Sequence, residues 1–412
     1  MALIVIKFGG SSVSDIDHIK NAASKVAQEA RRGNKVVVVT AAMAGATDQL
    51  MGYCRSITNH PNPRELDAVL AVGEQIAAGL LVMALEQRGL NARSWQGWQI
   101  PLVTDNDHNN ARITHVDIKK IKERLEAGEV AVVAGFQGVT EDGSIATLGR
   151  GGSDSSAIAL AAALGVDRCD IYTNVDGIYT ANPNIVSRAR RLSKVSHEEM
   201  LELSSLGARV LQARAIELAL RHKMPFQVLS TFSNQIGSDL PGTLITKEAD
   251  IMDTHPVSGI AHERGIAKIT LHGLPDQPGV AANVLGVLAR AGFNVDMIAQ
   301  ASAGDGYDAS ISVTVVRAEM ERAVETLRSE QDSLKFSTII TNDNVAKIRI
   351  VGMGMRTRHG IAALMFQALA EKSINIYLIE TSEISITVLI LEEYLELALR
   401  TLHTVFNLDK DG

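Results

Sequence analysis

The sequence predicts an α/β protein in which a mostly parallel sheet lies between helices and is followed by two small α+β modules. Three observations predict this fold class. Apolar runs alternate with helical patterns over residues 1–246, as in parallel sheets covered by helices. Residues 233–258 hold two of the nine prolines and little periodicity, which indicates a domain boundary. Residues 279–298 align without gaps on 360–379, with seven of twenty positions identical.

The strands predicted in the first block share uninterrupted apolar runs, the pattern of strands buried on both faces. They are expected at 3–8, 35–43, 129–136 and 169–175, with a closing strand at 242–245. The predicted helices share apolar residues at helical spacing and are expected at 15–32, 65–87 and 155–164. Ser14 is the expected N-cap of the first helix and Gly33 its stop, and Asp142 and Gly143 mark a turn.

Composition narrows the function classes. The chain has 412 residues and a net charge of −7, so it offers nucleic acid no general attraction. Its two cysteines build neither a disulfide framework nor a zinc site, which favours a reducing compartment. The apolar stretch 68–85 contains Glu74 and Gln75, so it is interpreted as a buried helix and not as a membrane span. Because a signal peptide is also not recognised, we expect a cytoplasmic protein with no membrane or nucleic-acid partner.

The repeat predicts two copies of one α+β module. Each copy follows an apolar strand, at 267–271 and 347–351, and continues as a helix, a strand and a second strand such as 384–391. Two copies are too few for a solenoid. Paired modules of this kind either bind a small ligand between them or only join two chains, and both interpretations stay open.

Two glycine-bearing loops indicate phosphate chemistry. Residues 9–12 and 149–154 each follow strand-like sequence and precede a helix, where backbone N–H groups can approach phosphate oxygens. Neither a Walker A motif nor a GxGxxG after a strand occurs. Lys7 stands at the carboxyl end of the first strand, where open α/β sheets bind ligands. It is a candidate to balance charge on a transferring phosphoryl group, the alternative being an ordinary solvated lysine.

Glu74 is a second candidate, because it is one of two polar residues in an otherwise apolar stretch. A buried carboxylate needs a partner. A substrate ammonium group would serve, and so would a structural ion pair inside the fold.

A series of motifs gives the chain a specific resemblance. In order they are KFGGSSV (7–13), AAMAGATD (41–48), GEQ (73–75), GFQG (135–138), TLGRGGSD (147–154), YTNVDGIYTANP (172–183), DQPGVAA (276–282) and TSEISITVLI (381–390). Over nearly its whole length the sequence resembles an aspartokinase of the amino acid kinase family with two regulatory ACT modules. The segment ARSWQGWQ (92–99) is similar to the bacterial form with the tandem ACT tail.

This resemblance implies the amino acid kinase fold and the phosphorylation of L-aspartate by Mg·ATP to 4-phospho-L-aspartate, the first step toward lysine, threonine, methionine and isoleucine. It implies Lys7 and Asp154 as catalytic residues. It implies a substrate-binding set of Thr47, Glu74, Arg150, Gly151, Gly152 and Ser153. It implies an ATP-binding set of Lys7, Phe8, Gly9, Gly10, Thr173, Asn174, Tyr179, Asn184, Arg209 and Val210. No metal ligand is assigned to a protein side chain.

The ACT resemblance implies feedback inhibition by lysine, threonine or both, and a homodimer or larger assembly joined through these modules. The implied effector positions in the first module are Asp276, Gly279, Val280, Ala281, Asn294, Val295, Asp296 and Gln300. Those in the second are Ile361, Ala362, Asn375, Ile376, Ser382 and Glu383. The expected domains are 1–246 (kinase), 247–262 (linker), 263–342 and 343–412 (ACT). The effector, the oligomeric state and an ACT-only subunit stay open.

Several positions depart from the family pattern. The family commonly has aspartate at Asn174 and Asn182, arginine at Asn184 and lysine at Arg209, all on the nucleotide side. Further departures are Ala41, Ala146, Asn109, where glycine is usual, Leu229 and the run ASAGDG after Gln300. Three interpretations follow. The first is an active, feedback-inhibited kinase, and the second is a catalytically weak or inactive relative that binds amino acids through its ACT modules. The third is a kinase of another amino acid.

Overall fold

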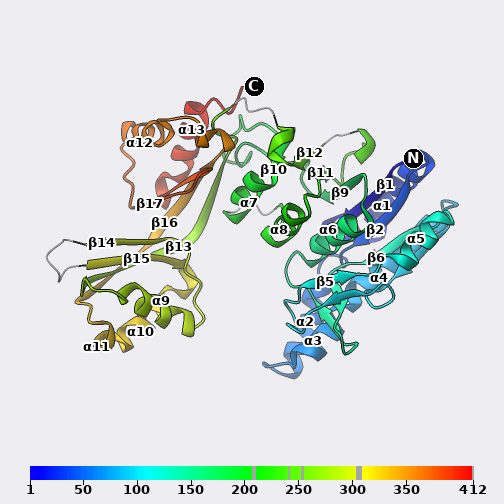
Figure 1. Ribbon diagram of the computed structural model, residues 1–412, viewed down its shortest axis with the longest axis horizontal. Helices are drawn as coiled ribbons and strands as arrows, with labels where there is room; N and C mark the ends of the chain where they lie inside the picture. The colour runs from blue at the N-terminus through cyan, green and yellow to red at the C-terminus, as the bar shows by residue number, and fades with distance from the viewer. Residues whose placement is uncertain (207–209, 240–241, 252–254, 303–308, 411–412) are drawn as a thin grey trace. The chain divides into compact units, whose positions relative to one another are not determined.

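The computed structural model describes residues 1–206, 210–239, 242–251, 255–302 and 309–410 (Figure 1). The chain forms two compact units. The first comprises Met1–Tyr179, Arg191–Ser205 and Arg209–Met252, and the second comprises Thr180–Arg190, Leu206–Ala208 and Asp253–Gly412. Residues 180–190, which were expected to belong to the kinase domain, therefore group with the second unit. The exact domain limits remain a prediction.

The first unit is built on an eight-stranded sheet of order β10-β12-β11-β9-β1-β2-β6-β3. Its strands are β1 (Leu3–Phe8), β2 (Lys35–Thr40), β3 (Ala92–Trp95), β6 (Val130–Ala134), β9 (Arg168–Thr173), β10 (Lys194–Ser196), β11 (Phe226–Ser230) and β12 (Thr243–Thr246). All neighbouring pairs are parallel except β11 with β12. The predicted mostly parallel sheet is thereby confirmed.

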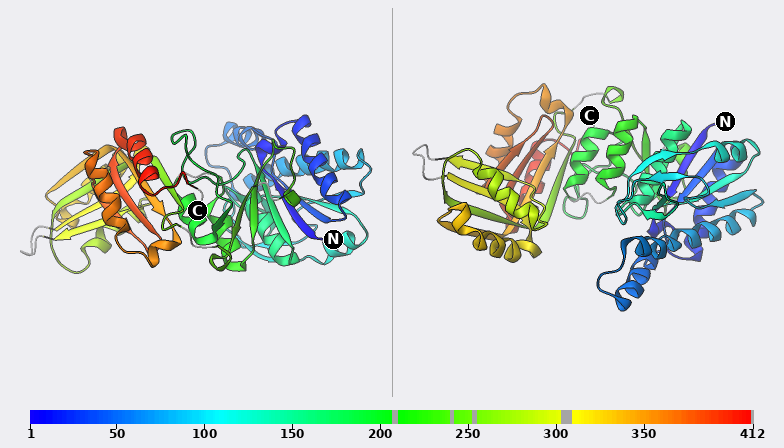
Figure 2. Two further views of the ribbon diagram at one scale, coloured as in Figure 1. Left: turned by 90° about the horizontal axis from the view of Figure 1, so that it is seen from above. Right: turned by 60° about the horizontal axis from the view of Figure 1, so that its bottom comes forward.

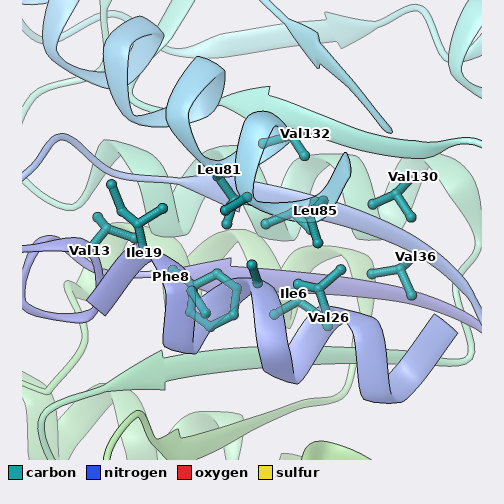
Figure 3. Packing of buried hydrophobic residues seen from close by; sticks show 14 of the residues in the cluster. Ile6, Phe8, Val13, Ile19, Val26, Val36, Leu81, Leu85, Val130 and Val132 are labelled. Carbon is teal, nitrogen blue, oxygen red and sulfur yellow. The ribbon is translucent and has the colours of Figure 1, made fainter. Parts of the chain in front are cut away.

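Helices cover both faces of this sheet. They are α1 (Ile16–Arg31), α2 (Ala46–Ile57), α3 (Pro63–Leu70), α4 (Val72–Glu86), α5 (Lys119–Glu126), α6 (Gly152–Leu164), α7 (His197–Ser205) and α8 (Ala213–His222). Figure 3 shows the core on one face, where α1 and α4 place Ile19, Val26, Leu81 and Leu85 against alternate residues of the central strands, among them Ile6. This alternation follows from the two-residue period of a strand, so the remaining side chains face the opposite helix layer.

A smaller four-stranded sheet, of order β5-β4-β7-β8, completes the first unit. Its strands are β4 (Leu102–Thr104), β5 (Ile113–Val116), β7 (Gln137–Val139) and β8 (Ile145–Thr147). Figure 2 shows the hairpin of α2 and α3 projecting from this unit, and α2 buries none of its residues. Short 3-10 turns lie at Gly10–Val13, Gly237–Asp239 and Glu248–Asp250.

Three predicted boundaries of the first unit are corrected. Asp15, not Ser14, caps α1, because Asp15 is extended and accepts a hydrogen bond from the His18 N–H, whereas Ser14 is itself helical. The helix expected at 65–87 is divided at Ala71 into α3 and α4. The stretch Pro63–Glu86 is long enough and apolar enough to cross a membrane. Half of its most apolar 18-residue window is buried inside the structure, however, as in a core helix. Finally, α6 begins at Gly152 and not at residue 155.

The second unit is one six-stranded antiparallel sheet of order β14-β15-β13-β16-β18-β17 (Figure 1). Its strands are β13 (Gly259–Leu274), β14 (Ile298–Ser302), β15 (Ala309–Val316), β16 (Thr338–Val351), β17 (Leu378–Thr381) and β18 (Ser385–Leu391). Its helices are α9 (Val280–Arg290), α10 (Met320–Ser329), α11 (Gln331–Leu334), α12 (Ile361–Glu371) and α13 (Leu395–Val405), with 3-10 turns at Arg317–Glu319, Met353–Arg356 and Glu392–Tyr394.

The two predicted modules share this sheet. The central strands β13 and β16 are long and pair with each other along most of their length. The first five residues of β13, Gly259–Glu263, pair with Lys347–Val351, although residues up to 262 were expected to form a linker. Ile260 lies in the hydrophobic core of the second module, together with Ala181 and Val186. The second module is therefore completed by segments that precede the first in the chain.

Candidate active site

The candidate site lies at the carboxyl edge of the parallel strands in the first unit. From β1 the chain adds β2, β6 and β3 on one side, and β9, β11 and β12 on the other. Ligands of open α/β sheets bind at such a point, because the loops after neighbouring strands diverge there and leave a crevice. Lys7 is the penultimate residue of β1, in register with Val39 of β2 and Ile171 of β9. The sequence prediction for Lys7 thus agrees with its place in the sheet.

Lys7 and Asp154 form an ion pair. The Lys7 Nζ and the Asp154 Oδ1 are 2.6 Å apart, and the two residues are only 8% and 6% exposed. Asp154 belongs to the first turn of α6, where the free N–H groups of the helix favour a negative charge. The Lys7 ammonium lies close to Gly9, since a Cβ on Gly9 would stand 3.3 Å from Nζ. The solvated-lysine alternative is therefore excluded.

A pocket of about 520 Å³ opens beside this pair. Seven residues predicted for catalysis or substrate binding line it: Lys7, Thr47, Arg150, Gly151, Gly152, Ser153 and Asp154. The other lining residues are Ala41, Met51, Leu66, Leu70, Asn109, Phe136, Thr147 and Gly149. Three elements distant in the sequence, β1, α2 and the loop that leads into α6, are thus brought to one cavity.

Glycine is required in the loop before α6. Gly151 has φ +72°, a left-handed conformation that costs glycine little. A Cβ on Gly152 would stand 2.8 Å from the Phe136 Cδ2 and 2.9 Å from the Leu148 Cβ. The loop therefore packs tightly between Phe136 and Leu148 at Gly152.

Glu74 is not itself one of the residues that line the pocket. It is 4% exposed, and its Oε1 accepts a hydrogen bond from the Ala42 N–H at 3.0 Å. Its Oε2 is buried without a hydrogen-bond partner in the described part of the chain. Burial raises the pKa of Glu74 to about 7, although the Ala42 hydrogen bond opposes this. No cation pairs with Glu74 in the described residues, which weakens the structural ion-pair interpretation.

The residues predicted for ATP are placed less completely. Thr173 ends β9 beside β1, and the Gly9 N–H donates to the Tyr172 carbonyl at 3.2 Å, so Gly9 and Thr173 share the carboxyl edge. The Phe8 side chain is fully buried and stacks on Tyr172, with ring centroids 5.1 Å apart. Only the Phe8 backbone is thus available to a phosphate.

The remaining nucleotide residues differ in their surroundings. Asn174 is exposed and accepts from the Thr173 hydroxyl at 3.2 Å. The Tyr179 hydroxyl donates to the Asp176 carboxylate at 3.0 Å, and Val210 is half-buried. Asn184 belongs to the second unit, and Arg209 lies outside the described residues. Their part in a nucleotide site stays a prediction.

The predicted effector residues all lie in the second unit. In the first module, Gly279, Val280 and Ala281 start α9, Asn294 and Val295 lie between α9 and β14, and Gln300 lies in β14. Asp276 accepts from the Ser302 hydroxyl, and Asp296 pairs with the buried Lys347. In the second module, Ile361 and Ala362 start α12, Asn375 and Ile376 precede β17, Ser382 bonds Ser385, and Glu383 pairs with Arg356. Their ligand role stays untested.

The sequence analysis missed a buried carboxylate below the pocket. Asp67 is 0% exposed and accepts hydrogen bonds from His108, from the Asn109 backbone and from Thr147. Asn109 and Thr147 line the pocket. A signal existed, because Asp67 lies on the buried face of α3 between Leu66 and Leu70, where an acid needs a partner.

The site suits a phosphate-bearing substrate. It offers a buried ammonium group on Lys7, backbone without side chains at Gly9 and Gly10, and the N-terminal end of α6. Among the described residues, no group of three or more His, Cys, Asp or Glu is arranged to hold a metal ion. Asp154, beside Lys7, is the acidic side chain that could contact a divalent cation. Such a cation would take its further ligands from the phosphates of the nucleotide.

Comparison with known proteins identifies the family of this chain. Residues 2–230 match the model of the amino acid kinase family, and residues 269–331 and 348–406 match an ACT domain. The aspartate kinase of Pseudomonas putida is 48% identical over 410 residues, which cover 99% of this chain and 98% of that protein. Aspartokinase 2 of Bacillus subtilis is 43% identical over 410 residues, covering 100% and 99%.

Solved structures agree with these sequence matches. Aspartate kinase from Synechocystis is 36% identical, with a TM-score of 0.55, covering 98% of this chain and 70% of that chain. Aspartate kinase from Clostridium acetobutylicum has a TM-score of 0.82 at 22% identity, covering 98% and 100%, and shows the same fold. With the family, the relatives and the site geometry in agreement, this chain belongs to the amino acid kinase family and, within it, to the aspartate kinases that carry ACT domains.

Proposed function

We propose that this aspartate kinase transfers the γ-phosphoryl group of Mg·ATP to the side-chain carboxylate of L-aspartate, giving 4-phospho-L-aspartate for lysine, threonine and methionine synthesis in the cytoplasm. The observation that carries the proposal is the buried Lys7–Asp154 pair at the edge of a pocket that also contains Arg150. A pocket of about 520 Å³ accommodates a small amino acid and a phosphoryl group.

The chemistry requires positioning rather than a general base. The β-carboxylate of aspartate is already ionised at neutral pH, so it attacks without proton transfer. The obstacle is the approach of an anion to a polyanion, which fixed cations overcome. In this proposal Lys7 neutralises charge that develops on the transferring phosphoryl group. Asp154 holds the Lys7 ammonium in place, and Arg150 binds the α-carboxylate of aspartate through its planar guanidinium group.

Glu74 would bind the α-ammonium group of the substrate. Its unpaired Oε2 and raised pKa support this role, because an arriving cation would stabilise the ionised carboxylate. Thr47 and the backbone at Gly151 and Gly152 complete the wall around the substrate. Magnesium, when bound with ATP, would supply further positive charge between the phosphates, with Asp154 as the acidic side chain nearest to Lys7.

Regulation is proposed to act through the second unit. We expect lysine, threonine or both to bind at the starts of α9 and α12 and in the segments before β14 and β17, in a homodimer or larger assembly. The N-terminal ends of α9 and α12 begin at left-handed glycines, Gly279 and Gly360, without side-chain caps. Such uncapped ends favour the carboxylate of an amino acid.

One observation favours a second candidate, a weak or inactive kinase with a regulatory role. Asn174, in place of the usual aspartate, is exposed and is engaged only with Thr173 in the described part of the chain. An amide retains an oxygen ligand but lacks the charge that magnesium favours. Replacing Asn174, Asn182 and Asn184 by Asp, Asp and Arg should therefore lower the KM for ATP, and an unchanged KM would remove this second candidate's support.

The first experiment is hydroxylamine trapping of the acyl phosphate from L-aspartate and Mg·ATP. We expect aspartyl hydroxamate from the wild-type chain, and a loss of at least about 100-fold in Lys7→Ala. The exposed Lys20→Ala on α1 is the matched control and should retain full activity. Tryptophan fluorescence checks folding, because both tryptophans, Trp95 and Trp98, lie in the first unit.

Three results decide between the candidates. Hydroxamate that depends on Lys7 supports the kinase, and its suppression by lysine or threonine identifies the effector. Absence of hydroxamate at saturating ATP, with amino acids still binding to the ACT domains, supports the inactive relative. Equal activity of Lys7→Ala and the wild-type chain would refute the proposed role of Lys7.

A further inference from the structure

A second pocket lies in the first unit, where α6 packs against α8 and β5 (Figure 1). Its volume is about 450 Å³. The walls come from the first turn of α6, one face of α8, the segment 110–113 and Leu148. None of the residues predicted for substrate or nucleotide binding lines it. This second pocket is therefore distinct from the candidate active site and has no role in the proposed function.

Positive charge dominates the second pocket. Three arginines line it, Arg112, Arg214 and Arg221, against the single carboxylate of Glu217. Arg112 and Arg221 make no ion pair with the described residues. Burial lowers the pKa of Arg214, and the nearby charge of Arg112 adds to this effect, although three neighbouring carboxylates oppose it. In a chain with a net charge of −7, a pocket of this kind favours a small anion.

The guanidinium group of Arg214 is held by neutral groups. It donates to the Leu148 carbonyl at 2.9 Å, to the Ala111 carbonyl at 2.6 Å, and to the side-chain and backbone oxygens of Asn110 at 3.1 and 3.3 Å. Dipoles of this kind solvate the charge of Arg214 but do not neutralise it. A partly buried charge is more stable beside an opposite charge, so an anion in the second pocket would stabilise Arg214.

Ser155 supplies an unused hydrogen-bond donor. It lines the second pocket and is 6% exposed, and its Oγ has no hydrogen-bond partner in the part of the chain that the structure describes. The next residue differs, because the Ser156 hydroxyl donates to the Gly152 carbonyl at 3.0 Å. A buried hydroxyl without a partner is unfavourable. Its O–H and the N–H groups of the arginines are all donors, so the ligand that they share must be an acceptor.

We propose that the second pocket binds a small phosphate-bearing anion between its three arginines and the Ser155 hydroxyl. A phosphate group carries close to two negative charges at neutral pH, and three arginines against one glutamate leave two positive charges in excess. Its oxygens accept several hydrogen bonds at once, and guanidinium groups bind them in pairs. A volume of about 450 Å³ also leaves room for the molecule to which a phosphate is attached.

The second pocket and the candidate active site share three segments of the chain. Neighbouring residues divide between the two pockets in each segment, with the active-site residue named first: Asn109 and Asn110, Gly149 and Leu148, Asp154 and Ser155. An anion would relieve the repulsion between Arg214 and Arg112, so that Arg214 holds Asn110 and Leu148 more firmly. We therefore expect the anion to strengthen aspartate binding, and this part of the inference rests on the proposed function.

Calorimetric titration of inorganic phosphate into the full chain, in a chloride buffer of low ionic strength, tests the second pocket. Ser155→Ala removes an unpaired hydroxyl and places alanine in a helix, so the fold is preserved and phosphate affinity should fall about tenfold. Arg221→Gln should lower the affinity about threefold, because Arg221 is exposed. The exposed Arg328→Gln on α10 is the matched control and should bind phosphate as the wild-type chain does. Wild-type affinity in both Ser155→Ala and Arg221→Gln would overturn the proposal.

Phosphate can also bind at the candidate active site, and Lys7→Ala separates the two sites. We expect Lys7→Ala to retain the phosphate binding that Ser155→Ala loses. Binding that is lost in Lys7→Ala and kept in Ser155→Ala would place the ion at the active site alone and overturn the proposal. Glycerol phosphate, titrated in the same way, distinguishes two sources of the anion. Tighter binding than that of inorganic phosphate identifies a phosphorylated molecule, and equal or weaker binding identifies the free ion.

Titration of L-aspartate with and without saturating inorganic phosphate, in the absence of ATP, tests the coupling. Aspartate should bind about fivefold more tightly in the presence of phosphate, which is the low end of ordinary allosteric effects. Ser155→Ala should show no such gain. An aspartate affinity that phosphate leaves unchanged or weakens would overturn the coupling. If the wild-type chain binds phosphate through Ser155 but forms no aspartyl hydroxamate, the proposed function fails and the second pocket remains, so the two failures are distinguishable.

Discussion

Replacing Glu74 by glutamine should stabilise the first unit at alkaline pH and leave it unchanged at acidic pH. Burial raises the pKa of Glu74 from 4.5 to about 7. Below pH 4.5 the carboxyl group is neutral in both folded and unfolded chains, so it imposes no cost. Between pH 4.5 and 7 the unfolded chain ionises first, so stability falls as the pH rises. Above pH 7 the cost is constant.

The magnitude follows from the two pKa values. At 1.36 kcal/mol per pH unit, the interval from 4.5 to about 7 corresponds to a cost of about 3 kcal/mol at pH 8. Glutamine keeps the shape and an oxygen for the Ala42 N–H while it carries no charge. The free energy of unfolding of Glu74→Gln should therefore exceed that of the wild-type chain by about 3 kcal/mol at pH 8, and by much less at pH 5.

Urea unfolding followed by tryptophan fluorescence measures this difference, because both tryptophans report on the first unit. Glu86→Gln is the matched control, since Glu86 lies on the same helix but is exposed. Its unfolding should show no pH-dependent difference from the wild-type chain. Equal stability of Glu74→Gln and the wild-type chain at pH 8 would refute the reasoning, because it would mean that Glu74 carries its charge without cost.

Three further predictions concern packing and charge. Gly237→Ala should lower the free energy of unfolding of the first unit by about 2–3 kcal/mol in the same urea assay, because its Cβ would stand 1.9 Å from an oxygen of the buried Asp170; wild-type stability would contradict the close packing. Lys347→Met should speed amide hydrogen exchange in β13 and β16, because it removes the ion pair with Asp296. The change should be equivalent to about 1–2 kcal/mol, since Asp296 is half-exposed. Unchanged exchange would show that the ion pair contributes nothing to stability. Burial lowers the pKa of His403, so stability of the second unit should fall as the pH falls below about 6.5; His403→Gln should remove this dependence in hydrogen exchange at pH 5 and 7.5, and a dependence that persists would assign it to another group.

The sequence predicted the elements whose burial is expressed in composition. β1, β2 and β6 are buried on both faces, so their apolar runs identify them without a partner strand being known. The four strands of the small sheet were missed because they have three or four residues each, too few for a period to be visible. The start of α6 was placed late because Gly152 and Ser153 are typical of loops, and only the left-handed Gly151 shows where the helix begins.

The candidate site was predicted in part for a similar reason. Lys7, Arg150 and Asp154 lie in motifs, and the structure brings them to one pocket. Asp67 and Asn109 lie outside the motifs that were used, and their relation depends on a contact between residues 42 positions apart. Sequence separation conceals such a contact, because the apolar neighbours of Asp67 indicate that the acid is buried but do not indicate which residue it contacts. The placement of residues 180–190 in the second unit was missed because the chain continues from β9 without any break in composition.

The shared sheet of the second unit has a consequence for synthesis of the chain. Gly259–Glu263 leave the ribosome before the first module, but their pairing partners Lys347–Val351 follow only after that module is complete. At about 5–20 residues per second, the interval is on the order of ten seconds. During this time the edge of Gly259–Glu263 lacks its partner strand and Ile260 lacks the core against which it packs. The first module can already fold on the remainder of β13. Exposed strand edges invite association with other chains. We therefore expect this edge to need protection from other chains until Lys347–Val351 have been synthesised.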